Sequence, residues 1–295
     1  MEQIKIVEVG PRDGFQNISR LVKLEDKLEV IRLLYEAGVR SMEIGSFVNP
    51  KAIPQMADMQ ELSRQVQSAY KDKMECIALV PNLRGAENAV NSGYNTVTYV
   101  TSVSEKHNLA NVRKTPTESM SALKDIMKVY PELKVRLDLA TSFGCPFEGA
   151  ISTEQVLHLA ETAIELGVRE IILCDTIGIA GPRQVSNLSE AFMNAFPDVT
   201  LGLHLHDTRG MGIVNIYAGY QNGVRVFETS VGGLGGCPFA PGAAGNTATE
   251  DLLYMAQQMG LDTAIDFEKY LSAVRYVRDY IQPQLTGRQM NLCRA

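Results

Sequence analysis

Apolar positions along the chain follow two alternating patterns. Short runs rich in β-branched and other apolar residues are separated by stretches in which apolar residues recur every three or four positions, as in KLEDKLEVIRLLYEAG (23–38). The runs that predict strands are 4–10, 41–45, 75–80, 96–102, 134–141, 170–175, 200–206 and 224–231. Eight strands alternating with helices in one continuous pattern predict a (β/α)8 TIM barrel, an α/β fold.

A glycine ends the helical stretch before four of these strands, at positions 38, 93, 167 and 223. The residue after a helix often adopts a left-handed conformation, which glycine reaches without a Cβ clash. No linker rich in Pro, Gly or Ser divides the chain, so we expect a single barrel domain over 1–285. The segment after about 260 predicts additional C-terminal helices packed on the barrel, and 286–295 is expected to form a disordered tail.

Charge and composition narrow the class of protein. A net charge of −6 and a pI near 5.4 argue against a nucleic-acid partner. No apolar run approaches the roughly 20 residues of a membrane helix, and the N-terminus lacks the pattern of a signal peptide. The five cysteines are widely scattered, which is typical of free thiols in a reducing compartment, and Cys76 and Cys174 are expected to be buried. A cytoplasmic protein is expected.

Two of the four histidines stand one residue apart in GLHLHDTRG (202–210). Because side chains alternate along a strand, His204 and His206 point to the same face. Active sites of such barrels lie at the C-terminal ends of the strands, where Asp13 follows the first strand. Two imidazoles and a carboxylate favour a divalent metal, Mg²⁺ or Mn²⁺, although imidazole also suits Zn²⁺ or Co²⁺. The alternative is a pair of hydrogen-bonded histidines lining a polar barrel interior.

Other charged residues also fall at or near strand ends. Arg12 precedes Asp13 and could neutralise an oxyanion, or belong to a solvated turn. Glu43 lies among apolar neighbours and needs a partner, for which Arg12 or a histidine is suited, and Asp175 ends the sixth run. Arg136 and Asp138 share one face of the fifth run, so they form either an interior ion pair or a substrate contact.

A glycine-rich segment, GGLGGCPFAPGAAGN (232–246), follows the eighth run. Such a loop can approach a ligand closely and close over it. Cys237 in its middle is a candidate general acid/base or nucleophile, the alternative being an incidental loop cysteine. The segment matches neither a P-loop nor a dinucleotide-binding motif.

Taken together, several motifs closely resemble the 3-hydroxy-3-methylglutaryl-CoA lyase family, in order and at similar spacing from residue 4 to about 260. These motifs are VEVGPRDGFQN, MEIGSFVNPKAIPQMAD, LVPNLRGAENAV, FGCPFEG, CDTIG, HLHDTRG and VGGLGGCPFAPGAAGNTATEDL. The resemblance implies divalent-metal-dependent cleavage of 3-hydroxy-3-methylglutaryl-CoA, or of a related 3-hydroxyacyl-CoA, to acetyl-CoA and acetoacetate or its counterpart. It also implies an acyl-CoA substrate and a homodimer.

The resemblance assigns roles to individual residues. The implied metal ligands are Asp13, His204, His206 and Asn246. The implied catalytic residues are Arg12, which stabilises the enolate, Glu43 and Asp175 as supporting acids, and Cys237 of the loop. The expected substrate contacts are Arg12, Gln16, Arg136 and Asp138. The group that removes the hydroxyl proton stays open among a histidine, Asp13 and Cys237 acting through water.

Two alternatives remain at this point. Acyl-CoA-condensing synthases of the isopropylmalate and homocitrate type share the Arg-Asp and His-x-His elements. Their second motif usually continues His-Asn-Asp, where this chain has His206-Asp207-Thr208, and they usually carry a further C-terminal region. A non-catalytic metal-binding barrel is the alternative from another class, but such a module would have no need of Cys237.

Overall fold

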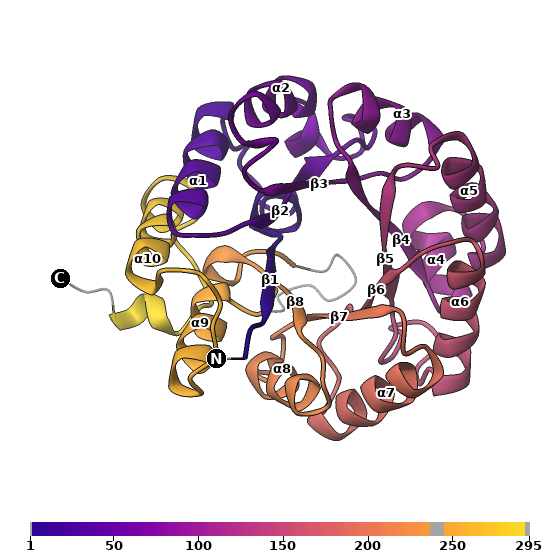
Figure 1. Cartoon of the computed structure of the whole chain (residues 1–295). Helices are drawn as coiled ribbons and strands as arrows, with labels where there is room; N and C mark the ends of the chain where they lie inside the picture. The colour runs from indigo at the N-terminus through magenta and orange to yellow at the C-terminus, as the bar shows by residue number, and fades with distance from the viewer. Residues whose placement is uncertain (1, 237–244, 293–295) are drawn as a thin grey trace.

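The computed structural model describes residues 2–236 and 245–292, and its centre is a closed barrel of eight parallel strands (Figure 1). Each strand pairs with the next in sequence, and β8 closes the ring against β1. The strands are β1 (Lys5–Glu8), β2 (Ser41–Ser46), β3 (Glu75–Leu79), β4 (Thr96–Ser102), β5 (Lys134–Ala140), β6 (Glu170–Asp175), β7 (Thr200–Leu205) and β8 (Val226–Thr229). All eight predicted strands are present, and the predicted TIM barrel is confirmed.

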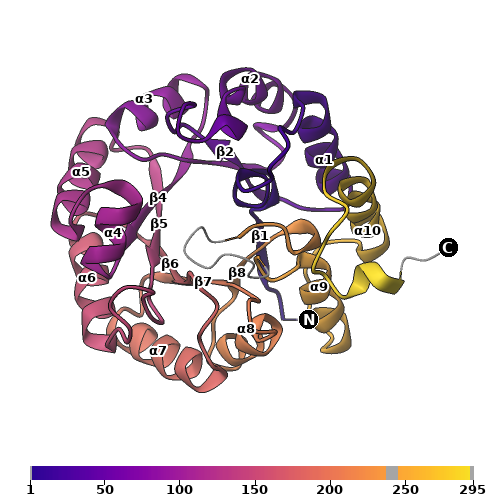
Figure 2. The same cartoon turned by 180° about the vertical axis from the view of Figure 1, so that it is seen from behind.

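Helices surround the barrel on its outside, as both views show (Figures 1 and 2). The α-helices are α1 (Leu24–Glu36), α2 (Met59–Tyr70), α3 (Leu83–Asn91), α4 (Glu105–Val112), α5 (Pro116–Val129), α6 (Thr153–Glu165), α7 (Pro182–Ala195), α8 (Gly212–Gln221), α9 (Thr249–Gln258) and α10 (Phe267–Tyr276). Short turns are η1 (Gly10–Gly14), η2 (Pro54–Met56), η3 (Val231–Gly233), η4 (Val277–Ile281) and η5 (Gln289–Leu292). None of the described helices is long and apolar enough to span a membrane.

The apolar core forms two separate clusters, because strand residues alternate between the two faces of the barrel wall. The larger cluster combines outward strand residues with the inner faces of the helices. The smaller one contains strand residues without helix partners and therefore lies inside the barrel: Val7, Val9, Ile77, Ile172, Cys174 and Val226. Polar residues two positions from an interior residue on the same strand also point inward, as Glu228 does after Val226.

The structure agrees with the predicted helix-ending glycines but differs from the predicted disordered tail. The four glycines at 38, 93, 167 and 223 all have positive φ, between 89° and 108°. The predicted extra helix is α10, and the Tyr276 hydroxyl donates to Asp26 Oδ1 of α1 at 2.9 Å. Residues 286–292 do not form a disordered tail, because the backbone amides of Thr286 and Arg288 donate to Gly232 and Asp251.

Candidate active site

The turn η1 directly follows β1 and presents Arg12 and Asp13. It is a single π-helical turn in which the amides of residues 12, 13 and 14 all donate to the Val9 carbonyl, at 3.1, 2.7 and 3.2 Å. π-helical turns are rare and occur often at functional sites. Arg12 is 6% exposed, donates from Nε to Glu43 Oε2, and donates from Nη1 to Asp13 Oδ1 at 2.6 Å. The predicted partner of Glu43 is thus Arg12.

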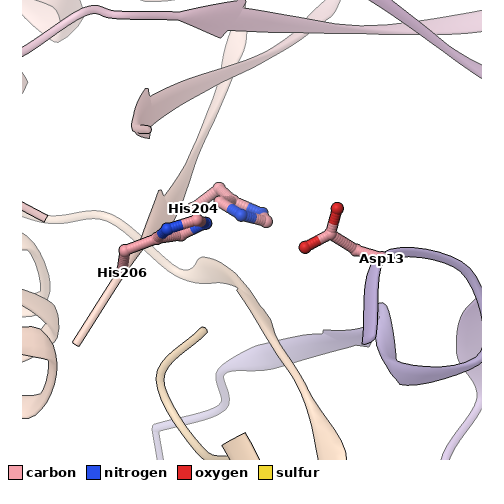
Figure 3. Close-up of side chains that lie close together, drawn as sticks. All are labelled: Asp13, His204 and His206. Atoms are coloured by element: carbon pink, nitrogen blue, oxygen red, sulfur yellow. The ribbon is translucent and has the colours of Figure 1, made fainter. Parts of the chain in front are cut away.

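Asp13 faces the two histidines at the end of β7 (Figure 3). One ligand atom from each of Asp13, His204 and His206 lies within 4.8 Å of the other two. The imidazole centroids are 5.3 Å apart, so both rings lie on the same face as alternation predicts. Leu201, Leu203 and Leu205 are buried on the opposite face.

Asn246 joins this group from the far end of the glycine-rich segment. Its Nδ2 donates to Asp13 Oδ2 at 2.7 Å and to the Leu234 carbonyl at 2.9 Å. A Cβ at Gly235, where φ is 129°, would lie 2.4 Å from Asn246 Nδ2. Only glycine therefore allows the backbone to pass so close to the Asn246 amide.

Two atoms of the group are buried without a hydrogen-bond partner among the described residues: Asn246 Oδ1 and His206 Nδ1. Buried polar atoms are nearly always satisfied, so such exceptions require an explanation. Carboxylate, amide oxygen and imidazole nitrogen are common ligands of divalent metals. The four side chains can therefore hold a divalent metal ion: two imidazoles and a carboxylate, as the residue pattern predicted, and the Asn246 amide that the resemblance implied.

Glu228 orients the first histidine. The register of β7 and β8 places it opposite His204, and its Oε2 accepts a hydrogen bond from His204 Nδ1 at 2.8 Å. Burial favours the neutral imidazole, but the hydrogen bond and charge of Glu228 raise the pKa of His204 to about 9. A carboxylate bound to one ring nitrogen directs the other toward a metal.

His206 has the opposite electrostatics. Burial and then the neighbouring His204 lower the pKa of His206 to about 4, which leaves its imidazole neutral near pH 7. Burial opposes ionisation of Asp13, but the charges of Arg12 and then His204 prevail and lower the pKa of Asp13. A neutral imidazole and an ionised carboxylate are the forms that bind metals.

Arg136 is buried in the barrel interior, where one alternative expected an ion pair. Its Nε donates to Glu170 Oε1 at 2.8 Å, and its Nη2 lies 2.9 Å from Glu228 Oε1. Burial would raise the pKa of Glu228, but Arg136 and His204 lower it to about 2. The partners of Arg136 are thus Glu170 and Glu228, and the arginine keeps Glu228 ionised beside His204.

Asp138 is buried on the same face of β5 as Arg136 and has a different electrostatic state. Burial, followed by the charges of Glu228 and Glu43, raises the pKa of Asp138 well above its usual range. Its Oδ1 has no hydrogen-bond partner in the described parts of the chain. A neutral carboxyl group with a free oxygen can donate or accept a hydrogen bond from a ligand.

Asp175 and Gln16 lie apart from these contacts. Asp175 follows the inward-facing Cys174, so its side chain turns to the outer face, where its two oxygens accept from the amides of Ile179 and Ala180 at 3.0 and 2.9 Å. It therefore shapes the loop between β6 and α7. Gln16 is half-buried just after η1. Cys237 lies outside the described residues.

The predictions from sequence missed Glu228 and its link to Arg136. A signal was present, since Glu228 stands two positions after Val226 in an apolar run and therefore shares its inward face.

Cys76 and Cys174 are buried as expected, and burial raises the pKa of Cys76 to about 12. They are therefore inert thiols.

Comparison with known proteins identifies the family. The HMGL-like family model matches residues 3–277. Hydroxymethylglutaryl-CoA lyase YngG of Bacillus subtilis is 41% identical over 293 residues, covering 99% of this chain and 97% of the relative. (R)-citramalyl-CoA lyase of Chloroflexus aurantiacus is 40% identical over 288 residues, covering 92% of this chain and 89% of the relative.

A solved structure agrees with these matches. It is an HMG-CoA lyase from Acinetobacter baumannii in complex with coenzyme A and 3-methylmalate, with a TM-score of 0.92 and 37% identity, covering 99% of this chain and 95% of that one. The similarity thus spans the whole barrel together with the C-terminal helices. The chain belongs to the HMGL-like family.

Proposed function

We propose that this carbon–carbon lyase cleaves 3-hydroxy-3-methylglutaryl-CoA to acetyl-CoA and acetoacetate in a metal-dependent reaction. The observation that carries the proposal is the group of possible metal-ligand side chains, Asp13, His204 and His206, with Asn246 bonded to Asp13. His206 and Asn246 each keep an unsatisfied buried polar atom, and the buried Arg12 lies beside Asp13. The names of similar proteins support the reaction class. A related acyl group is the second candidate, because the (R)-citramalyl-CoA lyase is nearly as similar.

Asp13, His204, His206 and Asn246 would hold the metal ion, which we propose to be Mg²⁺ or Mn²⁺. A divalent ion at this place supplies Lewis acidity that favours loss of the substrate hydroxyl proton. Glu228 fixes the ring of His204 through Nδ1, and Arg12 holds Asp13 through Oδ1. These contacts orient the ligands before substrate binds.

Arg12 would stabilise the negative charge that develops when the carbon–carbon bond breaks. Its guanidinium is held in place by Glu43 and Asp13, so it needs little reorganisation when charge appears on the acetyl-CoA enolate. Asp138, with its unpartnered Oδ1, and Gln16 are proposed to contact the substrate. Cys237 is proposed to transfer a proton, with Asp175 supporting the site through the β6–α7 loop.

A direct assay tests the proposal. Chelator-treated protein is incubated with 3-hydroxy-3-methylglutaryl-CoA, with and without Mg²⁺ or Mn²⁺, and in parallel with (R)-citramalyl-CoA. Metal-dependent acetoacetate release supports the first substrate, whereas metal-dependent pyruvate release selects the second. Consumption of acetyl-CoA with a 2-oxo acid would select a synthase. The absence of all three activities would leave a non-catalytic metal-binding barrel.

Replacing the loop cysteine separates proton transfer from metal binding. We expect Cys237→Ala to lower turnover by about 100-fold or more, in line with the contribution of one acid–base group. The Mn²⁺ titration should stay unchanged, because Cys237 is not among the proposed ligands. Cys76→Ala, at a buried inert thiol, is the matched control. Equal turnover of Cys237→Ala and parent would remove this residue from the mechanism.

A cytoplasmic homodimer acting on a small acyl-CoA completes the proposal. Coenzyme A bound in the similar structure supports the acyl-CoA substrate, and the acidic net charge of −6 disfavours a nucleic-acid partner. Light scattering on the purified chain tests the dimer, and a monomeric mass would contradict it.

A further inference from the structure

Glu8 ends β1 on the outer face of the barrel wall, opposite to the interior residue Val7. It is fully buried and accepts four hydrogen bonds. Its Oε1 accepts from the backbone amides of Gly10 and Val231, both at 2.8 Å. Its Oε2 accepts from the hydroxyls of Thr249, at 2.8 Å, and Tyr270. Every lone-pair direction of this carboxylate is therefore used.

The two backbone amides belong to the two segments that build the candidate site. Gly10 is the first residue of η1, the turn that presents Arg12 and Asp13. Val231 is the first residue of η3, which leads to Leu234, whose carbonyl accepts from the Asn246 amide. One carboxylate oxygen thus joins the segment carrying Asp13 to the segment that orients Asn246.

Close packing makes this junction specific. A Cβ at Gly10 would lie 2.6 Å from Glu8 Oε1 and 2.7 Å from Val231 Cγ1, so only glycine fits there. The next amide of η3 is held by a second buried acidic side chain, because Gly232 donates to Glu250 Oε2 at 3.0 Å. Hydrogen bonds from Val231 and Gly232 to two buried acidic side chains therefore fix the first two residues of η3.

We propose that Glu8 is a positioning residue for the metal site, which fixes the Asp13 turn relative to the segment that holds Asn246. Glu8 acts from behind the barrel wall, through Gly10 on one side and Val231 on the other. The inference rests on the proposed function, since it concerns the same four ligands. It adds a residue whose effect on metal affinity is transmitted entirely through backbone amides.

Two of the donors to Glu8 are backbone amides and two are hydroxyls, so variants can remove the amide contacts and a hydroxyl contact separately. Glu8→Gln keeps one oxygen for the two amides, and its NH₂ group can face the Thr249 and Tyr270 hydroxyls, which can turn to accept. Glu8→Met keeps the length of the side chain but leaves both amides without an acceptor. Tyr270→Phe is the matched control, because it removes a hydrogen bond to Glu8 without releasing either amide.

Calorimetric titration of the full-length apo-protein with Mn²⁺ is the measurement, with thermal unfolding alongside. We expect Glu8→Met to weaken Mn²⁺ binding by about 10- to 100-fold, the range seen for outer partners of metal ligands. Glu8→Gln and Tyr270→Phe should stay within about threefold of the parent, although Tyr270→Phe should also lower the unfolding temperature. Should Glu8→Met not fold, Glu8→Asp replaces it, because its shorter carboxylate cannot reach both amides.

The outcomes separate two kinds of failure. Parent-like Mn²⁺ binding by Glu8→Met, or by Glu8→Asp in its place, overturns the inference and leaves the proposed function standing. Weakened binding by Glu8→Gln or by Tyr270→Phe equal to that of Glu8→Met also overturns it, because a general loss of stability would then explain the data. A parent protein that binds no Mn²⁺ overturns the proposed function and this inference together.

Discussion

Two buried polar clusters lie on opposite faces of the barrel wall and differ in how far their polar atoms are satisfied. The inner cluster comprises Asp13, His204, His206 and Asn246, and the outer cluster comprises Glu8, Thr249, Glu250 and Tyr270. In the inner cluster Asn246 Oδ1 and His206 Nδ1 have no hydrogen-bond partner within the described chain. In the outer cluster Glu8 accepts four hydrogen bonds.

The difference indicates which cluster awaits a ligand. An unsatisfied buried polar atom costs about 1–3 kcal/mol, so the inner cluster lowers the stability of the metal-free protein. A bound cation would use Asn246 Oδ1 and one ring nitrogen of His206, and would offset part of that cost. In the outer cluster the Glu8 carboxylate already has four donors, and these hydrogen bonds fix the backbone. Unsatisfied atoms on side chains of metal-ligand type, grouped around Asp13, thus distinguish the inner cluster from the supporting one.

The largest expected effect comes from removing one inner ligand. We expect His206→Ala to abolish measurable Mn²⁺ binding and to lower lyase turnover by about 1000-fold or more, because a metal supplies several kcal/mol of transition-state stabilisation. Its metal-free unfolding free energy should change by less than about 1 kcal/mol, since an unsatisfied group is removed. Manganese titration, the acetoacetate assay and urea unfolding measure these three quantities.

The exposed His158 on α6 provides the control for that substitution, and His158→Ala should alter none of the three quantities. A loss of 3 kcal/mol or more in metal-free His206→Ala would contradict the comparison. It would show that His206 is a structural member of the interior.

A smaller effect is expected one contact away, at Glu228. Glu228→Gln removes the negative charge beside His204 and leaves Arg136 with one carboxylate partner. We expect Mn²⁺ affinity to fall by about 10- to 100-fold. Glu170→Gln, which removes the other partner of Arg136 and does not contact His204, should cost less than threefold. Equal losses in both variants would assign the effect to Arg136 instead of the histidine.

The barrel and three members of the inner cluster could be predicted from the pattern of the sequence, whereas Asn246 came only from the family resemblance. Alternation along β7 placed His204 and His206 on one face, and the strand-end rule brought Asp13 to the same end of the barrel. The glycines at 38 and 167 marked helix ends through their backbone conformation. Such features depend on residues close in sequence or on a general property of the fold.

The outer cluster could not be predicted, because its contacts join residues far apart in the chain. Glu8 and Tyr270 are 262 positions apart, and no local pattern relates them. Asp175 is a different case: its strand-end position suggested the site, although the local alternation from Cys174 turns its side chain to the loop side. Pairing across strands, as between Glu228 and His204, required the register of the sheet.

The smallest expected effect on activity belongs to Glu250, whose Oε1 is the unsatisfied atom of the outer cluster. Burial raises the pKa of Glu250 to about 8, so near pH 7 the folded protein keeps this group protonated. A protonated carboxyl can remain in an apolar place at a lower cost than a carboxylate. Glu250 can therefore stay buried because it is neutral. Its raised pKa predicts how the stability of the fold depends on pH.

Between about pH 4.5 and pH 8 the unfolded chain loses this proton while the folded chain retains it, so the Glu250 contribution to stability falls as pH rises. The slope of this decline is at most about 1.4 kcal/mol per pH unit.

Glu250→Gln stays neutral at every pH and should remove this part of the decline in stability. Its lyase turnover should stay within about threefold of the parent, because Gln can still accept from the Gly232 amide. Urea unfolding from pH 5 to pH 8 provides the measurement, with Glu161→Gln on the exposed surface of α6 as the control. Parallel pH profiles for parent and Glu250→Gln would mean that Glu250 is already ionised in the folded chain over this pH range.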